Sequence, residues 1–191
     1  GGVFHTSTAA SLMPNCMTTI TGNYLDNCFV EMTNEHADQP DYNAQYSFGG
    51  LTITGNTFIA QSVGSWFSWI VVTPRGAGHF ISGLSVIGNV FRCREVSIER
   101  VERVDTTYAT LNYTSFKNIS FESNTFNGVS QATCSPLLIE HVQGTAADTW
   151  VVDGAGYMPF LGRARNGTGV AVEGALTNAA NATQWAQPID R

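Results

Sequence analysis

The chain carries short runs in which apolar residues alternate with small or polar residues, and these runs recur along its length. In 51–58, Leu-Thr-Ile-Thr-Gly-Asn-Thr-Phe, the first, third and eighth residues are apolar. Related runs occupy 18–25, 84–91 and 119–126. Alternation is typical of a β-strand, and the Gly-Asn pair that breaks it is typical of a tight corner. The pattern therefore predicts a strand that ends at a sharp corner, repeated four times.

An asparagine stands at the corner of each run, with intervals of 33, 33 and 35 residues: Asn23, Asn56, Asn89 and Asn124. A fixed period of this size is typical of a stacked-repeat architecture. The Gly or Ser before each asparagine supplies the corner, because both Gly and Asn tolerate left-handed backbone conformations. Equivalent asparagines of stacked strands lie about 4.7–4.9 Å apart, so we predict that they form a hydrogen-bonded ladder. Their role is expected to be structural.

The repeated Leu-x-Ile-x-Gly-Asn-x-Phe unit covers roughly 17–142 and resembles the coils of the right-handed parallel β-helix, the pectate-lyase-like superfamily. That superfamily includes polysaccharide lyases, polygalacturonase-type hydrolases and bacteriophage tailspikes. The resemblance implies an all-β fold of about four coils, each of 33–35 residues. Such a motif is specific for the fold and leaves the activity open.

Two regions are expected. Residues 1–143 would form the coils, incomplete at the N-terminal end because one period counted back from Asn23 falls before residue 1. The repeat stops at 144, so 144–191 would be a cap or oligomerisation segment with an irregular tail. Gly-rich turns there separate three predicted short strands, at 150–154, 157–161 and 170–173.

Composition narrows the possible partners. Only 13% of the 191 residues are charged and the formal net charge is −6, which argues against nucleic acid and anionic membrane surfaces as partners. No run approaches the roughly 20 apolar residues of a transmembrane helix, so no membrane insertion is expected. The cysteines Cys16, Cys28, Cys93 and Cys134 lack metal-ligand spacing. We expect reduced cysteines, no metal and no other cofactor.

Stacking at 33 residues predicts which distant residues become neighbours. It places Trp66 beside Glu99, and Trp69 between His36 and Glu102. Aromatic rings offer flat apolar platforms for sugars, and carboxylates accept hydrogen bonds from sugar hydroxyls. The candidate carbohydrate-binding residues are therefore His36, Trp66 and Trp69. Trp66 and Trp69 have opposite parity along a strand, so one of them is expected in the core or a subunit interface.

Paired carboxylates about 5–9.5 Å apart can hydrolyse a glycosidic bond, and the same patch supplies three candidate catalytic residues, Glu35, Glu99 and Glu102. The resemblance weakens this interpretation. Polygalacturonase-type enzymes carry Asn-Thr-Asp, paired aspartates, Gly-His-Gly and Arg-Ile-Lys motifs, of which only Gly78-His79 has an echo here. A catalytic role is therefore the weaker hypothesis.

Three functions remain open. The first is a carbohydrate-recognising shaft or receptor-binding module of a tailspike-like protein at an extracellular or virion surface. Its partner would be a cell-surface or extracellular polysaccharide, and the resemblance implies a homotrimer. The second is a polysaccharide-degrading enzyme, either a lyase or a glycoside hydrolase. The third is a purely structural or adhesin β-helix.

Overall fold

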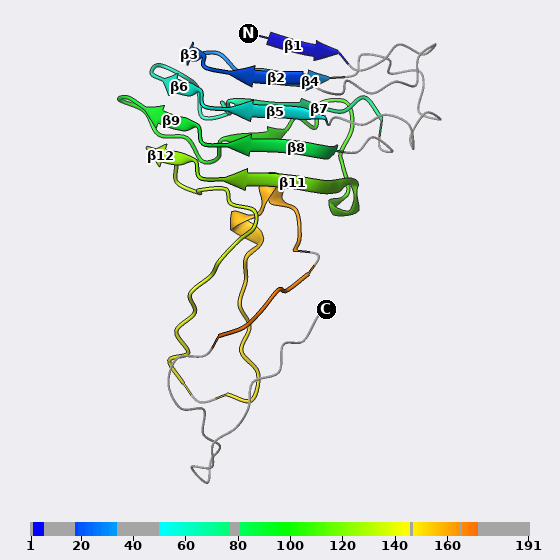
Figure 1. Ribbon diagram of the computed structural model, residues 1–191, viewed down its shortest axis with the longest axis vertical. Helices are drawn as coiled ribbons and strands as arrows, with labels where there is room; N and C mark the ends of the chain where they lie inside the picture. The colour runs from blue at the N-terminus through cyan, green and yellow to red at the C-terminus, as the bar shows by residue number, and fades with distance from the viewer. Residues whose placement is uncertain are drawn as a thin grey trace.

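The computed structural model describes residues 2–5, 18–33, 50–76, 81–145, 147–164 and 166–171. Within these residues the chain is all-β, with three parallel sheets and short 3-10 turns in place of α-helices. Figure 1 shows the sheets gathered in one body, from which an extended segment projects. No helix in the described part of the chain has the length and apolar character needed to cross a membrane.

Each repeat contributes successive strands to the three sheets, and equivalent strands of neighbouring repeats pair in parallel. The first sheet has the order β11-β8-β5-β2: β2 Thr18–Thr21, β5 Leu51–Thr54, β8 Ile81–Ile87 and β11 Phe116–Glu122. The second has the order β12-β9-β6-β3: β3 Tyr24–Asp26, β6 Thr57–Ala60, β9 Val90–Cys93 and β12 Thr125–Asn127. The third has the order β1-β4-β7-β10: β1 Gly2–His5, β4 Val30–Thr33, β7 Ile70–Thr73 and β10 Glu102–Val104.

Apolar residues at equivalent positions of the repeats stack to form the core. Ile53 and Val86 pair in register on β5 and β8 and are fully buried. On the second sheet the ring of Phe91 stacks on Phe58 at a centroid distance of 4.8 Å and on Phe126 at 5.7 Å. The alternation in the sequence therefore corresponds to one buried and one more exposed row of side chains on β5 and β9, whereas all four residues of β7 are buried.

The four asparagines lie in one column at the corner between the first and second sheets. The backbone N–H and the Nδ2 amide of Asn23 both donate to Oδ1 of Asn56, at 3.0 and 3.1 Å. Asn56 donates in the same way to Asn89, at 3.0 Å for both bonds. Asn89 donates to Asn124 at 2.9 and 3.1 Å. The residue before each asparagine has a positive φ, between 55° and 69°: Gly22, Gly55, Gly88 and Ser123.

The third sheet does not keep the 33-residue offset. The turn between the second and third strands of a repeat is short between Asp26 and Val30 and long between Ala60 and Ile70. Val30 therefore pairs with Ile70, and a hydrogen bond between Thr33 and Thr73 spans 40 residues. The period of the repeat survives because the following turn, from β7 to β8, is correspondingly shorter than that from β4 to β5.

The C-terminal segment differs from the prediction of short strands. Residues 150–154 form no strand, and 157–161 lies within the 3-10 turns η3 Ala155–Tyr157 and η4 Pro159–Leu161. Pro159 begins η4, and Phe160 has φ 54° and ψ 31°, so the backbone cannot continue as a strand. Of the third predicted strand, 170–171 is not a strand and the rest lies outside the described residues. The remaining turn, η2, is Tyr113–Ser115.

The segment around η4 closes the end of the core beside the last repeat. The buried Phe160 ring stacks on Phe116 at 5.7 Å and meets Phe121 edge-on at 6.3 Å. Its backbone N–H donates to Oε1 of Glu102, at 3.0 Å. Residues far along the chain thus cover apolar side chains that no further strand covers in the described structure.

Candidate functional site

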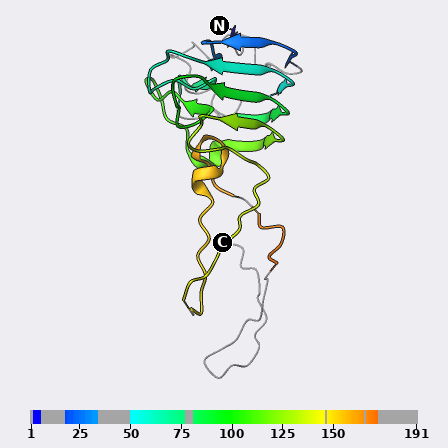
Figure 2. The same ribbon diagram turned by 90° about the vertical axis from the view of Figure 1, so that its left-hand side faces the viewer.

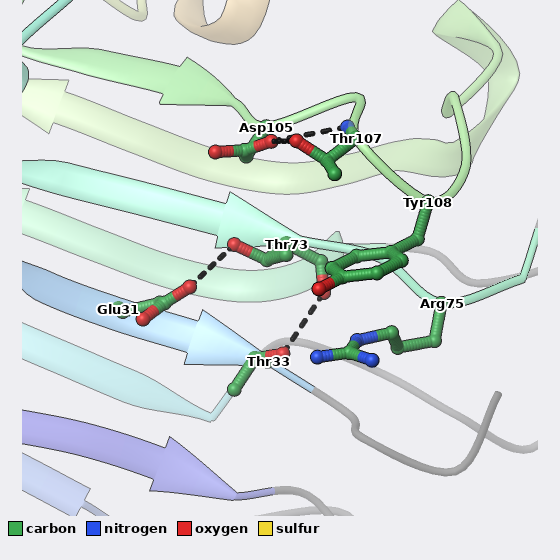
Figure 3. Close-up of a pocket in the computed structure, with 7 residues that line it drawn as sticks. All are labelled: Glu31, Thr33, Thr73, Arg75, Asp105, Thr107 and Tyr108. Carbon is green, nitrogen blue, oxygen red and sulfur yellow. Dashed lines mark hydrogen bonds between the residues drawn. The ribbon is translucent and has the colours of Figure 1, made fainter.

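A polar hollow of about 320 Å³ lies at the carboxyl ends of β4, β7 and β10, shown in Figure 3. Three neighbouring strands end there, so side chains from separate repeats converge. The lining residues are Glu31, Thr33, Thr73, Arg75, Asp105, Thr107 and Tyr108.

Strand alternation explains why polar residues gather at this place. Val30 and Met32 of β4 belong to the core, so Glu31 and Thr33 lie on the opposite face of the sheet. The register pairs Thr33 with Thr73, and the backbone N–H of Asp105, just after β10, donates to the carbonyl of Val72 at 2.7 Å.

Hydrogen bonds fix the side chains on β4 and β7. The Thr73 hydroxyl donates to Oε1 of Glu31 at 2.6 Å, and the Thr33 hydroxyl donates to the backbone carbonyl of Thr73 at 3.2 Å. Both bonds are drawn in Figure 3. They hold a carboxylate and two hydroxyl groups in place, which favours specific hydrogen bonding to a polar ligand.

Asp105 is held in one orientation by donors close to it in sequence. Its Oδ1 accepts from the hydroxyl of Thr107 at 2.6 Å and from the Thr107 N–H at 3.0 Å, and its Oδ2 accepts from Arg103 at 3.0 Å. These contacts, above all the Thr107 hydroxyl, lower the pKa of Asp105 below its ordinary value. The carboxylate therefore stays ionised and is suited to accepting hydrogen bonds rather than to donating a proton.

Two exposed aromatic rings lie near this face, each beside an arginine. The Arg75 guanidinium carbon is 3.7 Å from the centroid of the Tyr108 ring, and Tyr108 is 56% exposed. The Arg103 guanidinium carbon is 5.9 Å from the ring of Trp66, which is 62% exposed. Cation–π contact limits the motion of each ring while leaving much of its surface open.

Replacing Asp105 with Asn is expected to remove a pH-dependent contribution to stability. Because the folded-state pKa of Asp105 is lowered, its stabilising effect is present above the unfolded-state pKa and is lost as the pH falls through the folded-state value. The free-energy gap between wild type and D105N should therefore shrink from about pH 7 to about pH 3. Urea denaturation at several pH values measures this gap. A free-energy gap that stays constant across this pH range would contradict a lowered folded-state pKa of Asp105.

The predicted patch of six residues is not assembled in the structure as the 33-residue stacking implies. Glu35 and His36, like Gly78-His79, lie outside the described residues. The strand register pairs Ile70 with Val30 of β4 and with Glu102 of β10. The residues that correspond to Trp69 in the neighbouring repeats are therefore Phe29 and Val101, not His36 and Glu102. The stacking prediction is wrong at this face because the turn before β7 is much longer than the turn before β4 and is one residue longer than the turn before β10.

Burial separates the remaining members of the patch. Trp69 and Glu102 are both 0% exposed, so neither offers surface to a sugar ring, whereas Glu99 is exposed. Trp69 packs edge-on against Phe67 at 5.8 Å within the core. Glu102 points into the core and pairs with Arg100. Of these four residues, Trp66 has the exposed ring that a carbohydrate contact requires.

Sequence reasoning missed the residues that line the hollow. Signals for some of them were present: Glu31 and Thr33 alternate with Val30 and Met32, which marks an outward polar face. Asp105-Thr-Thr107 is typical of a turn in which an aspartate side chain accepts a hydrogen bond from the backbone N–H of the second residue after it. Arg75 and Tyr108 lie in turns outside the repeated motif, where periodicity predicts nothing.

No cluster of three or more His, Cys, Asp or Glu side chains suited to a metal ion occurs among the described residues. The cysteines that the structure describes, Cys28, Cys93 and Cys134, are free thiols. What the hollow offers is a set of hydroxyl, carboxylate and guanidinium groups beside an aromatic ring. Such a set recognises a neutral or mixed polar ligand by hydrogen bonding and stacking.

Comparisons with protein-family models, curated proteins and solved structures gave no match to this chain. The geometry of the hollow is therefore the basis for a functional assignment.

Proposed function

We propose that the chain is a carbohydrate-recognising shaft or receptor-binding module of a tailspike-like protein. In this proposal the three parallel sheets are the sides of a right-handed parallel β-helix of about four coils within 1–143, and 144–191 is a cap or oligomerisation segment. The proposed glycan recognition rests on the hollow at the ends of β4, β7 and β10, which is lined in part by the exposed Tyr108.

The hollow has the groups that a sugar ring needs. Its hydroxyl groups and carboxylates donate to and accept from sugar hydroxyls, and an aromatic face packs against the C–H groups of the ring. Strand pairing and the hydrogen bonds of Glu31 and Asp105 position these groups before a ligand arrives. Preorganisation of this kind reduces the entropy lost on binding. The partner is therefore proposed to be a cell-surface or extracellular polysaccharide.

The location and assembly follow the same proposal. A module that recognises surface glycans works outside a cell or on a virion, and a tailspike-like shaft is expected to be a homotrimer. No cofactor is required for binding. A purely structural or adhesin β-helix would use the same sheets, and its hollow would bind no glycan.

A polysaccharide-degrading enzyme is the second candidate, since two carboxylates, Glu31 and Asp105, line the same hollow. A glycoside hydrolase needs one carboxyl group with a raised pKa to act as general acid. The pKa of Asp105 is lowered, and Glu102, whose pKa is raised by burial, has no contact with solvent. Binding without cleavage is therefore favoured for this hollow.

Replacing Tyr108 with Ala is expected to weaken glycan binding roughly tenfold, about 1.4 kcal/mol, because it removes a stacking surface. Trp66→Ala tests whether the site extends along the sheet to the second exposed ring. Affinities would be measured by glycan-array screening and then by calorimetry on the best polysaccharide fragment. Tyr24→Ala is the matched control, since Tyr24 is 64% exposed but lies on β3 of another sheet.

The outcomes distinguish the candidate functions. Equal affinities of the folded Tyr108→Ala, Trp66→Ala and control variants would refute the location of the site. Absence of glycan binding by the wild type would favour the structural reading. Release of reducing ends, or of unsaturated uronates detected by absorbance, from capsule or pectin-like polysaccharides would favour the enzyme.

A further inference from the structure

The hollow at the carboxyl ends of β4, β7 and β10 is lined from three successive repeats, whose strands lie one above another in Figures 1 and 2. Each threonine hydroxyl of the lining already donates its proton within the protein. Thr33 donates to the carbonyl of Thr73 at 3.2 Å, and Thr73 donates to Oε1 of Glu31 at 2.6 Å. Thr107 donates to Oδ1 of Asp105 at 2.6 Å. Because a hydroxyl group has a single proton and two lone pairs, the three threonines present lone pairs to a ligand.

The two carboxylates of the lining, Glu31 and Asp105, are acceptors as well. An ionised carboxylate has no proton to donate. Oε1 of Glu31 accepts the bond from Thr73, and among the residues that the structure describes none donates to its Oε2. Both oxygens of Asp105 accept internal bonds, and these contacts, above all the Thr107 hydroxyl, lower its pKa and keep it ionised. Five of the seven lining residues thus present acceptors.

The donors of the lining are the guanidinium of Arg75 and the hydroxyl of Tyr108. Figure 3 shows Arg75 beside the Tyr108 ring, and its guanidinium carbon lies 3.7 Å from the ring centroid. A second guanidinium, that of Arg103, pairs with Asp105 at 3.0 Å. The two carboxylates of the lining are therefore matched by two guanidinium groups, and the hollow has no surplus of positive charge that would attract an anion.

Neutral and acidic sugar units would interact differently with this lining. The hydroxymethyl group of a neutral unit can donate a hydrogen bond to an open acceptor such as Oε2 of Glu31. A carboxylate or sulfate in its place has no proton to donate, and it brings a negative charge close to Glu31 and Asp105. The formal net charge of −6 adds repulsion over a longer distance. A protonated amine would instead meet the guanidinium of Arg75 in the same hollow.

We propose that the hollow selects neutral, hydroxyl-rich sugar units and discriminates against units that carry a carboxylate or sulfate group. This inference rests on the proposed glycan recognition and adds to it the chemical class of the recognised polysaccharide. Glu31 is the specificity-determining residue, because it has an open acceptor oxygen and because Thr73 holds its side chain in position. The Tyr108 ring contributes affinity for both classes of sugar, since both have C–H groups that pack on an aromatic face.

Matched pairs of glycans test this selectivity on the full chain. Oligomers of glucose, galactose and mannose are arrayed beside uronate oligomers of the same linkage, which have a carboxylate in place of each hydroxymethyl group. Calorimetry on each pair that binds gives the two dissociation constants. We expect the neutral member to bind at least about tenfold more tightly, because the uronate loses a donor and adds a repelled charge.

Replacing Glu31 with Gln tests whether the hollow is the source of the discrimination. Gln keeps a carbonyl oxygen that can accept from Thr73, but it supplies an amide donor and removes the charge. The preference for the neutral member should therefore fall at least about threefold. Glu122→Gln is the matched control, because it changes the net charge equally at an exposed carboxylate on β11 of the first sheet. It should keep the wild-type preference, and circular dichroism checks that both variants are folded.

The contrary results separate the inference from the proposed function. A wild type that binds the uronate member as tightly as the neutral one, or more tightly, overturns the inference and leaves glycan recognition standing. An equal fall in preference in Glu31→Gln and Glu122→Gln overturns it as well, because net charge rather than the hollow would then set the selectivity. A wild type that binds neither member of any pair overturns both the proposed glycan recognition and the inference.

Discussion

Replacing Arg100 with Met is expected to lower the free energy of unfolding by about 3–5 kcal/mol, because it leaves Glu102 as an unpaired buried charge. Glu102 is 0% exposed, and its Oε1 accepts from Nε and an Nη of Arg100 at 3.0 and 2.6 Å. Arg100 also donates to the carbonyls of Gly156 and Met158, so it joins β10 to the segment that closes the core. Guanidinium denaturation of the variant measures the loss.

The loss should depend on pH with a defined sign. Burial raises the pKa of Glu102, and Arg100 is the main opposing influence. A group with a raised folded-state pKa contributes stability below its unfolded pKa and loses that contribution as the pH rises through its folded pKa. The variant should therefore be most impaired at neutral pH and recover partly near about pH 4, where glutamate protonates in the unfolded chain.

A double variant tests whether the buried charge is the cause. Arg100→Met together with Glu102→Leu removes both charges, so it should be more stable than Arg100→Met alone, although the Phe160 N–H loses its acceptor. Arg103→Met is the exposed counterpart, since the Arg103–Asp105 pair is about 30% exposed, and should cost under about 1 kcal/mol. A double variant less stable than the single one would contradict this explanation.

Replacing Asn89 with Ala is expected to cost about 3 kcal/mol, because several buried polar groups lose their partners together. Its Oδ1 accepts two hydrogen bonds from Asn56, and its Nδ2 donates to Asn124 and to the carbonyl of Ile53 at 2.9 Å. Asn89 and Asn56 are each 1% exposed, so water cannot replace these bonds without rearrangement. Thermal and chemical unfolding would report the loss.

Asn23→Ala is the matched control at the end of the same column. Asn23 is exposed, and its side chain donates to Asn56 and to the carbonyl of Thr21. Oδ1 of Asn56 keeps the hydrogen bond from the Asn23 backbone N–H, at 3.0 Å, and the carbonyl of exposed Thr21 can be hydrated, so the cost should be about 1 kcal/mol or less. Equal costs at Asn23 and Asn89 would mean that burial of the column is not what makes it stabilising.

The parallel pairing of the first two sheets could be predicted because its determinants lie close together in the sequence. Leu51 and Ile53 alternate on one strand, and Gly55-Asn56 ends it, so a ten-residue window contains both the strand and its corner. The positive φ at Gly55 agrees with the expected corner. All-β structure with parallel sheets is accordingly confirmed, while the closed β-helix with about four coils stays a proposal.

The register of the third sheet could not be predicted from the period alone. The period fixes the total length of a repeat but not how that length is divided among its turns. The long turn that contains Trp66 is balanced by a short one before β8, so the interval from Asn56 to Asn89 is unchanged. Trp69 was misplaced relative to β4 for this reason, and it was misplaced relative to Glu102 because the turn before β10 is one residue shorter than the turn before β7.

The candidate site was less predictable than the fold. Glu102 was expected to be a catalytic residue in a patch open to a sugar, yet it is buried, and Arg100, Thr133 and Phe160 donate hydrogen bonds to its carboxylate. Thr133 and Phe160 lie 31 and 58 residues further along the chain. Tyr108 and Arg75 come together from different turns, and their contact depends on register that the motif does not encode.

The pairing of each strand with only the strands one repeat before and after it has a consequence for how the chain folds. Nearest-neighbour contacts of this type allow nucleation in any adjacent pair of repeats, followed by the addition of one repeat at a time. The loop closed at each step is about one repeat long, so each addition costs a similar loop-closure entropy. Folding can thus propagate from one repeat to the next, and the contact of Phe160 with Phe121 of β11 forms last, after the final repeat has folded.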